Sequence, residues 1–459
     1  MSSTREIEGG LYGQSLSEEQ VRSAFCTGEF PVAVYGLGKM GLPLASVYAG
    51  VSGNVIGVDV DPDVVKTINN GGCHVKREPG LDELVAETVE SRALQATTDT
   101  VGAASESTVH VVIVPTPITD EKEPDLSILD SVIMDIGEGL TAGDLVVVEC
   151  TVPPRTTEDR VTPRLAEVSG LNSGEFGVAF CPERTSSGRA LEDIRGAYPK
   201  VVGGVDDEST QVAAAIYEEI NDEGVIPVSN ATTAECVKVF EGLYRDVNIA
   251  LANELATFTD EFGMDVREAI EVANTQPFCN IHDPGPGVGG HCIPFYPYFV
   301  IDPFETDAPV LETAREVNDS MPEFTVRKLC EEFDAEGLSV EEASVLVLGL
   351  TYRPGVEEIR ASPSISIADE LSERGADVYG VDPILEKFEV FELEQLELSA
   401  LYEYEFDGVV LVTPHKEFDT IDWDRLGRDG GSVVIDGRES LNLGGTQHRI
   451  YTIGSGFNV

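Results

Sequence analysis

The chain has 459 residues, of which 42% are hydrophobic, and its 83 acidic and 30 basic side chains give a formal net charge of −53. Its length predicts two or three domains, and the sequence contains no apolar run near the roughly 18 residues that a membrane span needs. The charge argues against a nucleic-acid-binding surface, because there is no basic stripe to neutralise phosphates, and it indicates the solvated acidic coat of a halophile, tolerated where molar salt reduces the Debye length to about 3 Å.

Residues 1–29 indicate an acidic N-terminal extension with an amphipathic stretch near Leu16–Phe25. This extension has no apolar segment behind basic residues, so we expect no secretory signal and a cytoplasmic protein. Residues 30–229 alternate short apolar runs with segments of helical spacing, a pattern typical of a doubly wound domain with a parallel sheet. The expected strands are residues 32–35, 54–59, 109–114, 145–150, 177–180, 201–203 and 225–227.

Residues 230–335 indicate a helical domain. Residues 231–262 contain no proline and one glycine, so we expect a long helix, and helices of this length usually join domains or build dimers. A segment rich in proline and glycine, 277–303, precedes a second helical stretch over 309–333. Residues 336–459 repeat the strand pattern at 343–349, 377–382, 408–413 and 432–436. The predicted class is therefore α/β, with two Rossmann-like domains joined by a central helix and a helical dimerisation region.

The glycine turn Gly36-Leu-Gly-Lys-Met-Gly41 follows the first strand and opens a helix, and the second strand ends at Asp59. Such glycines can form a turn alone, but this context suits a dinucleotide, whose pyrophosphate approaches the helix N-terminus while the carboxylate binds the ribose. Asp59 and Asp61 would repel a 2′-phosphate, which favours NAD over NADP. The expected cofactor contacts here are Gly36, Gly38, Met40, Gly41 and Asp59.

The eight cysteines include no CxxC pair, which argues against a metal site or a disulfide framework. Most should be small buried hydrophobes. Cys292 is different because it follows closely spaced glycines and prolines in the loop Pro284-Gly-Pro-Gly-Val-Gly-Gly-His-Cys-Ile-Pro294, which offers few apolar neighbours and lets a ligand approach the backbone. We expect a reactive thiol there. The adjacent His291 either lowers the pKa of this thiol or has a structural, solvent-facing role.

This loop, together with the segment Tyr244-Arg-Asp-Val-Asn-Ile-Ala-Leu-Ala-Asn-Glu254, resembles the UDP-glucose/GDP-mannose dehydrogenase family. Within this family the chain looks like the branch acting on UDP-N-acetylmannosamine or UDP-N-acetylglucosamine, with UDP-N-acetylmannosamine favoured, and the resemblance extends over residues 30–440. It implies a UDP-sugar substrate whose C6 alcohol is oxidised by two NAD in turn. Cys292 would capture the aldehyde as a thiohemiacetal, which is oxidised to a thioester and hydrolysed to the UDP-uronic acid. It also implies a homo-oligomer of at least two subunits.

The resemblance assigns further roles residue by residue. Lys238 would stabilise oxyanions at the reacting carbon, Glu183 would assist proton transfer through water, and Thr151 would lie near the nicotinamide and that water. Glu183 and Lys238 would also contact the substrate. The other implied contacts are Thr116, Thr151 and Arg360 to the cofactor, and Gly289, Tyr352, Arg353 and Arg438 to the substrate. Taken singly, each of these arginines would more often form a surface ion pair.

Three positions depart from the family pattern. Gly242 replaces an asparagine four residues after Lys238, Tyr296 replaces an aspartate four residues after Cys292, and Phe278 replaces an arginine that reaches the neighbouring subunit's substrate. Glycine costs about 1 kcal/mol relative to alanine inside a helix, so helix stability does not explain Gly242. Three consequences of these departures remain open: slower hydrolysis of the thioester, a different sugar substrate, or loss of activity.

The alternatives are a UDP-glucose 6-dehydrogenase and an impaired paralogue that binds nucleotide sugar or NAD without turnover. The Cys292 loop and the third domain disfavour a simpler hydroxy-acid dehydrogenase.

Overall fold

The computed structural model describes residues 10–14 and 16–457, so residues 1–9 of the predicted extension lie outside the described part. The chain divides into two compact units. Unit 1 comprises the residues up to 240 together with 298–304, and unit 2 comprises 241–297 and 305–459. In the described residues no helix combines the length and apolar character that a bilayer span requires.

Unit 1 is built on an eight-stranded sheet of order β3-β2-β1-β4-β5-β6-β7-β8, parallel except for the β6–β7 pair. Every residue of β1, β4, β5 and β6 is buried, as expected for parallel strands covered on both faces. The strands are β1 Val32–Tyr35, β2 Val55–Val58, β3 Leu94–Thr97, β4 Val109–Val112, β5 Leu145–Val148, β6 Gly177–Phe180, β7 Lys200–Gly204 and β8 Val225–Pro227.

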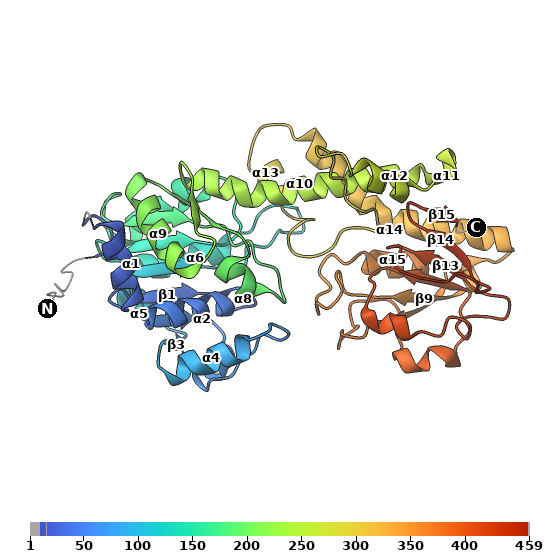
Figure 1. Cartoon of the computed structure of the whole chain (residues 1–459), viewed down its shortest axis with the longest axis horizontal. Helices are drawn as coiled ribbons and strands as arrows, with labels where there is room; N and C mark the ends of the chain where they lie inside the picture. The colour runs from blue at the N-terminus through green and yellow to red at the C-terminus, as the bar shows by residue number, and fades with distance from the viewer. Residues whose placement is uncertain (1–9, 15, 458–459) are drawn as a thin grey trace. The chain divides into compact units, whose positions relative to one another are not determined.

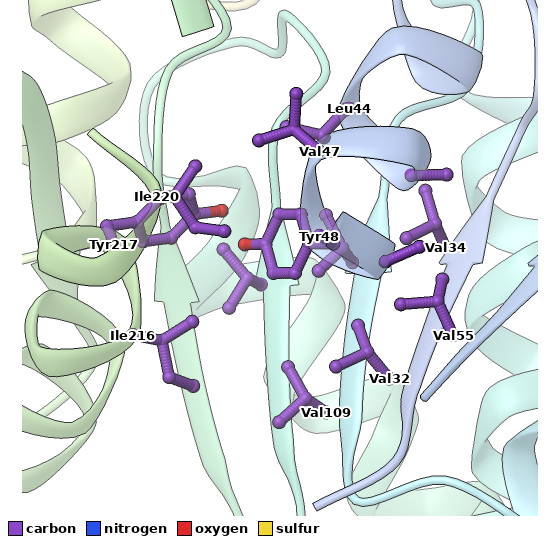
Figure 2. Packing of buried hydrophobic residues seen from close by; sticks show 14 of the residues in the cluster. Val32, Val34, Leu44, Val47, Tyr48, Val55, Val109, Ile216, Tyr217 and Ile220 are labelled. Atoms are coloured by element: carbon purple, nitrogen blue, oxygen red, sulfur yellow. The ribbon is translucent and has the colours of Figure 1, made fainter. Parts of the chain in front are cut away.

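Helices cover both faces of this sheet, and each face has its own apolar core. Figure 2 shows one core, where Tyr48 and Tyr217 turn their hydroxyls toward each other near Val32 and Val109. The helices are α1 Glu18–Cys26, α2 Gly41–Ser52, α3 Pro62–Asn69, α4 Leu81–Glu90, α5 Thr100–Ser105, α6 Ser127–Gly139, α7 Thr162–Ser169, α8 Ala190–Glu192, α9 Asp207–Ile220 and α13 Tyr298–Ile301, with π-helical turns η1 Thr157–Val161 and η2 Asp193–Ala197.

The amphipathic stretch of the N-terminal extension forms α1, which begins at a capping box on Ser17. This helix packs against α9, where Arg22 binds Glu218 at 2.8 Å and Glu219 at 2.5 Å. The extension is thus held on unit 1 by apolar and ionic contacts.

The predicted long helix is two helices, α10 Ala231–Thr257 and α11 Thr259–Phe262, separated at Phe258. Phe258 has a ψ of −3°, and its amide donates to the Leu255 carbonyl three residues earlier at 3.1 Å, so the regular helical bonding is interrupted there. Figure 1 labels α10, which begins in unit 1 and ends in unit 2.

Unit 2 has a seven-stranded sheet of order β11-β10-β9-β12-β13-β14-β15, parallel except for the β14–β15 pair. Its strands are β9 Ser344–Leu348, β10 Asp377–Val381, β11 Glu394–Gln395, β12 Gly408–Leu411, β13 Val433–Asp436, β14 Arg449–Thr452 and β15 Gly456–Phe457. Its further helices are α12 Val266–Ala273, α14 Pro309–Glu336 and α15 Pro363–Glu373, with 3₁₀ turns η3 Val340–Glu342, η4 Leu398–Glu403 and η5 Lys416–Thr420. Helices α14 and α15 lie along this sheet (Figure 1). Two parallel-dominated sheets and a long central helix confirm the predicted fold class.

Candidate functional site

The predicted dinucleotide turn lies between β1 and α2, and its glycines have three different environments. Gly36 adopts a φ of +94°, and a Cβ there would lie 2.5 Å from the Ile113 carbonyl oxygen. A Cβ at Gly41 would overlap the Gly36 carbonyl, so this glycine lets α2 pack closely on the strand. Gly38, in contrast, faces open space. This is the pattern that a pyrophosphate needs, with a tight turn, an open approach and close helix packing.

Asp59 follows β2 directly and lies beside the same turn. Its Oδ2 accepts the Leu37 amide at 2.9 Å and its Oδ1 accepts the Asp61 amide at 3.0 Å, which fixes the orientation of the carboxylate. No side chain caps the N-terminus of α2, so the amides of its first turn can bind an anion. These residues fit NAD, with the pyrophosphate at α2 and a ribose hydroxyl on Asp59.

Lys238 and Glu183 are paired in unit 1. The Lys238 ammonium donates to the Glu183 carbonyl and lies 3.5 Å from its carboxylate, which also accepts the amide and hydroxyl of Thr185. Burial alone would raise the pKa of Glu183, but the Lys238 charge and the Thr185 hydrogen bonds outweigh it and hold the pKa below its usual value. Glu183 is therefore a carboxylate at neutral pH, as orientation of a water molecule requires.

Hydrogen bonds join the segments that follow the strands of unit 1. Thr116 donates its hydroxyl to the Thr151 carbonyl at 2.6 Å, which joins two segments predicted to contact the cofactor. The buried Glu149 accepts the Tyr217 hydroxyl and lies 3.4 Å from the Lys200 ammonium, while its carbonyl accepts the Glu183 amide at 3.3 Å. The ends of β5 and β6 are thus held together.

Sequence reasoning missed several of these supporting residues. Thr185 donates its amide and its hydroxyl to the Glu183 carboxylate, and its hydroxyl oxygen lies 3.0 Å from the Met40 sulfur. Glu149 and Lys200 form a buried pair. Glu235 accepts the amides of residues 155 and 157, and burial raises its pKa to about 7. The spacing of Glu235 and Lys238 on one helix face was a usable signal for this residue. The Glu149–Lys200 pair could not be predicted from a local sequence pattern, because its two residues are far apart in the chain.

In unit 2, Cys292 exposes its side chain, whereas Cys150 and Cys181 are buried. Burial raises the pKa of the Cys150 thiol to about 12, so that thiol is inert. The Cys292 carbonyl accepts the amides of Phe295 at 3.1 Å and Tyr296 at 2.9 Å, and these bonds close a compact turn.

The glycines before Cys292 are in close contact with residues predicted to bind substrate. A Cβ at Gly285 would lie 2.8 Å from the Arg438 guanidinium carbon. A Cβ at Gly289 would lie 2.7 Å from Cβ of Tyr352, and one at Gly290 would lie 2.8 Å from the ring of Tyr352. The structure therefore brings Gly289, Tyr352 and Arg438 together along the cysteine loop.

Arg438 is a partly buried cation held by carbonyls. It donates to the carbonyls of Val412 and Gly287, each at 3.3 Å, and in the described part of the chain it pairs with no carboxylate. Burial, with Arg267 nearby, lowers the pKa of Arg438 to about 10, so it remains charged at neutral pH. Such a cation suits an anionic ligand such as a diphosphate.

Four further residues of this unit were singled out in the sequence: Arg360, Arg353, His291 and Phe278. Arg360 contributes its carbonyl, which accepts the Gly290 amide at 2.8 Å, and its side chain is exposed. Arg353 is partly buried beside Tyr352 in the chain. His291 places Nε2 2.9 Å from Glu358, an unpredicted partner, which favours the structural role for this histidine. Phe278 is 94% exposed.

A buried polar network holds the start of the loop. Asp246 and Asn253 of α10 bind Arg315 and Asn318 of α14, at 2.5 and 2.9 Å respectively, and Asn253 also accepts the Gly285 amide at 2.9 Å. The amide of Asn318 donates to Asp246 at 2.9 Å. The segment that resembled the family thus contains the polar residues that fix the cysteine loop.

Comparisons with known proteins identify the same regions. The UDP-glucose/GDP-mannose dehydrogenase models match in three parts: the NAD binding domain over residues 30–221, the central domain over 232–320 and the UDP binding domain over 346–442. The chain is 37% identical over 413 residues to a UDP-N-acetyl-D-mannosamine dehydrogenase of Pyrococcus horikoshii, covering 89% of this chain and 96% of the relative. It is 36% identical over 419 residues to an NDP-N-acetyl-D-galactosaminuronic acid dehydrogenase of Ralstonia nicotianae, covering 89% and 95%. The solved structure of UDP-D-ManNAc dehydrogenase from P. horikoshii matches with a TM-score of 0.84 and 34% identity, over 92% of this chain and 99% of that one.

Proposed function

Because the chain belongs to the UDP-glucose/GDP-mannose dehydrogenase family and is an NAD-dependent UDP-sugar dehydrogenase, we propose that it oxidises the C6 alcohol of UDP-N-acetylmannosamine to the carboxylate through Cys292. One observation carries this proposal. Cys292 is an exposed thiol at the end of a glycine loop that is packed against Tyr352 and Arg438.

Bound NAD supplies the hydride acceptor in each of two oxidations. The Cys292 sulfur adds to the aldehyde formed in the first oxidation, which gives a thiohemiacetal. Loss of a second hydride gives the thioester, and water then displaces the sulfur, releasing the UDP-uronic acid and the free thiol. The overall change consumes two NAD and one water per sugar.

We assign the supporting roles by resemblance and chemistry. The Lys238 ammonium stabilises negative charge on the substrate oxygen, and the Glu183 carboxylate orients the hydrolytic water and accepts its proton. Tyr352, Arg353, Arg438 and Gly289 bind the UDP-sugar. Gly36, Gly38, Met40, Gly41, Asp59, Thr116, Thr151 and Arg360 bind NAD.

The choice of sugar rests on the relatives. N-acetylmannosamine is named in the P. horikoshii relative and an N-acetylgalactosamine derivative in the R. nicotianae relative, so an N-acetylated UDP-sugar is favoured over UDP-glucose. A paralogue without turnover is the second candidate, because Gly242, Tyr296 and Phe278 remove polar groups. The presence of Cys292, Lys238 and Glu183 favours catalysis.

Steady-state assays test the proposal. Purified protein in molar KCl with NAD should form two NADH per UDP-N-acetylmannosamine, and Cys292→Ser should form none. Cys26→Ser is the matched control, because Cys26 is also exposed but lies on α1. Absence of NADH with UDP-N-acetylmannosamine, UDP-N-acetylgalactosamine and UDP-glucose would exclude the enzyme and leave the binding paralogue.

We further propose a cytoplasmic dimer that supplies uronic acids for surface polysaccharide or glycoprotein. All eight cysteines are free, in keeping with a reducing compartment. Tyr244 and Leu251 expose about half of their surface on α10, at 50% and 47%, and Val272 of α12 exposes 62%. On so acidic a protein, such apolar side chains suit contact with a second copy. Light scattering in molar KCl tests this assembly, and a monomer at micromolar concentration would refute it.

A further inference from the structure

Two of the positions that depart from the family pattern, Gly242 and Tyr296, touch each other within unit 2. A Cβ at Gly242 would overlap the Tyr296 ring at Cδ2 and would lie 2.8 Å from Cγ and 2.9 Å from Cβ of that tyrosine. These separations are shorter than any real Cβ contact, so the ring occupies the space of a side chain at 242. Tyr296 is 6% exposed, and Gly242 is in the interior of α10. The ring therefore packs directly on the helix backbone.

The same tyrosine is coupled to the nucleophile. Its amide donates to the Cys292 carbonyl at 2.9 Å, so Cys292 and Tyr296 are the two ends of one turn. On the other side of Cys292, the Tyr352 ring packs against Gly290, whose amide donates to the Arg360 carbonyl at 2.8 Å. Each side of the cysteine segment is thus held by a tyrosine ring packed on a glycine.

We propose that Gly242 and Tyr296 form a size-matched positioning pair that sets the place of Cys292 for the reaction. The proposal rests on the proposed function of Cys292. The two departures are then one coupled change: the absence of a side chain at 242 makes room for the ring at 296, and the ring seats the cysteine turn on α10. Tyr296 acts in this role through the bulk of its ring.

Single and paired substitutions test the pair. Gly242→Ala adds a good helix former, so the helix itself is favoured, but the methyl group displaces the ring and with it Cys292. We expect kcat to fall about tenfold to a hundredfold, as for a small misplacement of a reacting group, with KM for NAD unchanged. Tyr296→Phe keeps the ring and should retain kcat within about twofold, whereas Tyr296→Ala should lower it.

The decisive comparison is the double variant. If the pair acts by mutual fit, adding Gly242→Ala to Tyr296→Ala should lower kcat by less than about twofold, because the clash has been removed. Gly50→Ala is the matched control. Gly50 is exposed in α2, and a Cβ there would lie 3.9 Å from Cδ1 of Leu84, an ordinary van der Waals contact. Gly50→Ala should leave kcat unchanged.

Two results would overturn the pair: wild-type kcat in Gly242→Ala, or an equal loss from Gly242→Ala in the wild-type and Tyr296→Ala backgrounds. If Gly242→Ala does not fold, a folded double variant supports the pair and an unfolded one contradicts it. Alkylation of Cys292 by iodoacetamide, followed on the Cys292 peptide with Cys26 as internal reference, reports the displacement without turnover. If the wild-type protein forms no NADH, the proposed function is refuted. The positioning pair is still supported in that case if Gly242→Ala changes the alkylation rate of Cys292 and Gly50→Ala does not.

Discussion

Glu183 is a partly buried carboxylate whose pKa is set by burial, by Lys238 and by Thr185. Burial is the largest influence on its pKa and acts upward, while Lys238 and the Thr185 hydrogen bonds act downward and prevail. In the wild type, therefore, the stability that this carboxylate contributes is present above its usual pKa and is lost as pH falls through the lowered value. Without Lys238 the sign should reverse, because burial then dominates and ionisation of Glu183 costs stability as pH rises.

Lys238→Met tests this reasoning by urea unfolding in constant KCl. The loss in free energy of unfolding relative to wild type should grow from pH 4 to pH 7 and reach about 3 kcal/mol, the order found when a buried ion pair loses one partner. Lys66→Met, at an exposed position of α3, should change stability by less than about 0.5 kcal/mol at every pH. A deficit that is constant across this pH range would show that Lys238 does not control the ionisation of Glu183.

At the scale of elements, the contact between α10 and α14 supports the cysteine loop. Asn253→Ala would remove the acceptor of the Gly285 amide and the donor to the Asn318 side-chain oxygen, both of which are buried. We expect the free energy of unfolding to fall by about 2–3 kcal/mol, the cost of unsatisfied buried polar groups. We also expect kcat to fall, because Gly285 begins the loop that ends at Cys292. The neighbouring Glu254→Ala, on the exposed face of α10, should change neither quantity; equal effects of the two variants would contradict the role of Asn253.

The sequence predicted the elements whose pattern is local. The parallel strands are continuous apolar runs, and the glycine turn, its helix and Asp59 lie within one short segment, so their arrangement follows from order in the chain. Strand β3 was missed because the exposed Gln95 and the partly buried Thr97 interrupt its apolar residues, so it is not a continuous apolar run like β1. The end of α10 was placed too late because the interruption is in the backbone at Phe258, which helical periodicity does not reveal.

The surroundings of Cys292 were only partly predictable. The resemblance named Tyr352 and Arg438 as substrate residues, but their packing on Gly285, Gly289 and Gly290 depends on tertiary contacts more than 60 residues apart in the chain. The partnership of Gly242 and Tyr296 was equally hidden, because one residue is in a helix and the other in a turn 54 positions later. From the sequence, Gly242 and Tyr296 were therefore interpreted as two separate losses of a polar side chain.

For the whole molecule, the net charge of −53 predicts a strong dependence on salt. Repulsion among the carboxylates opposes the compact state at low ionic strength and is screened at molar salt. The thermal midpoint of unfolding should therefore rise between 0.1 and 2 M KCl, by several degrees for each kcal/mol gained. Sucrose at matched viscosity is the control for solvent effects unrelated to charge. A midpoint independent of KCl would contradict the proposed halophilic adaptation.

The covalent role proposed for Cys292 is the central claim about the reaction. Its most direct test is the mass of the Cys292 peptide after the protein, NAD and UDP-N-acetylmannosamine are mixed and quenched in acid during the first turnover. We predict a mass increase by the UDP-sugar acyl group on that peptide, with the mass of the Cys26 peptide unchanged. Formation of two NADH per sugar with no adduct on Cys292 at any time in the first turnover would contradict it.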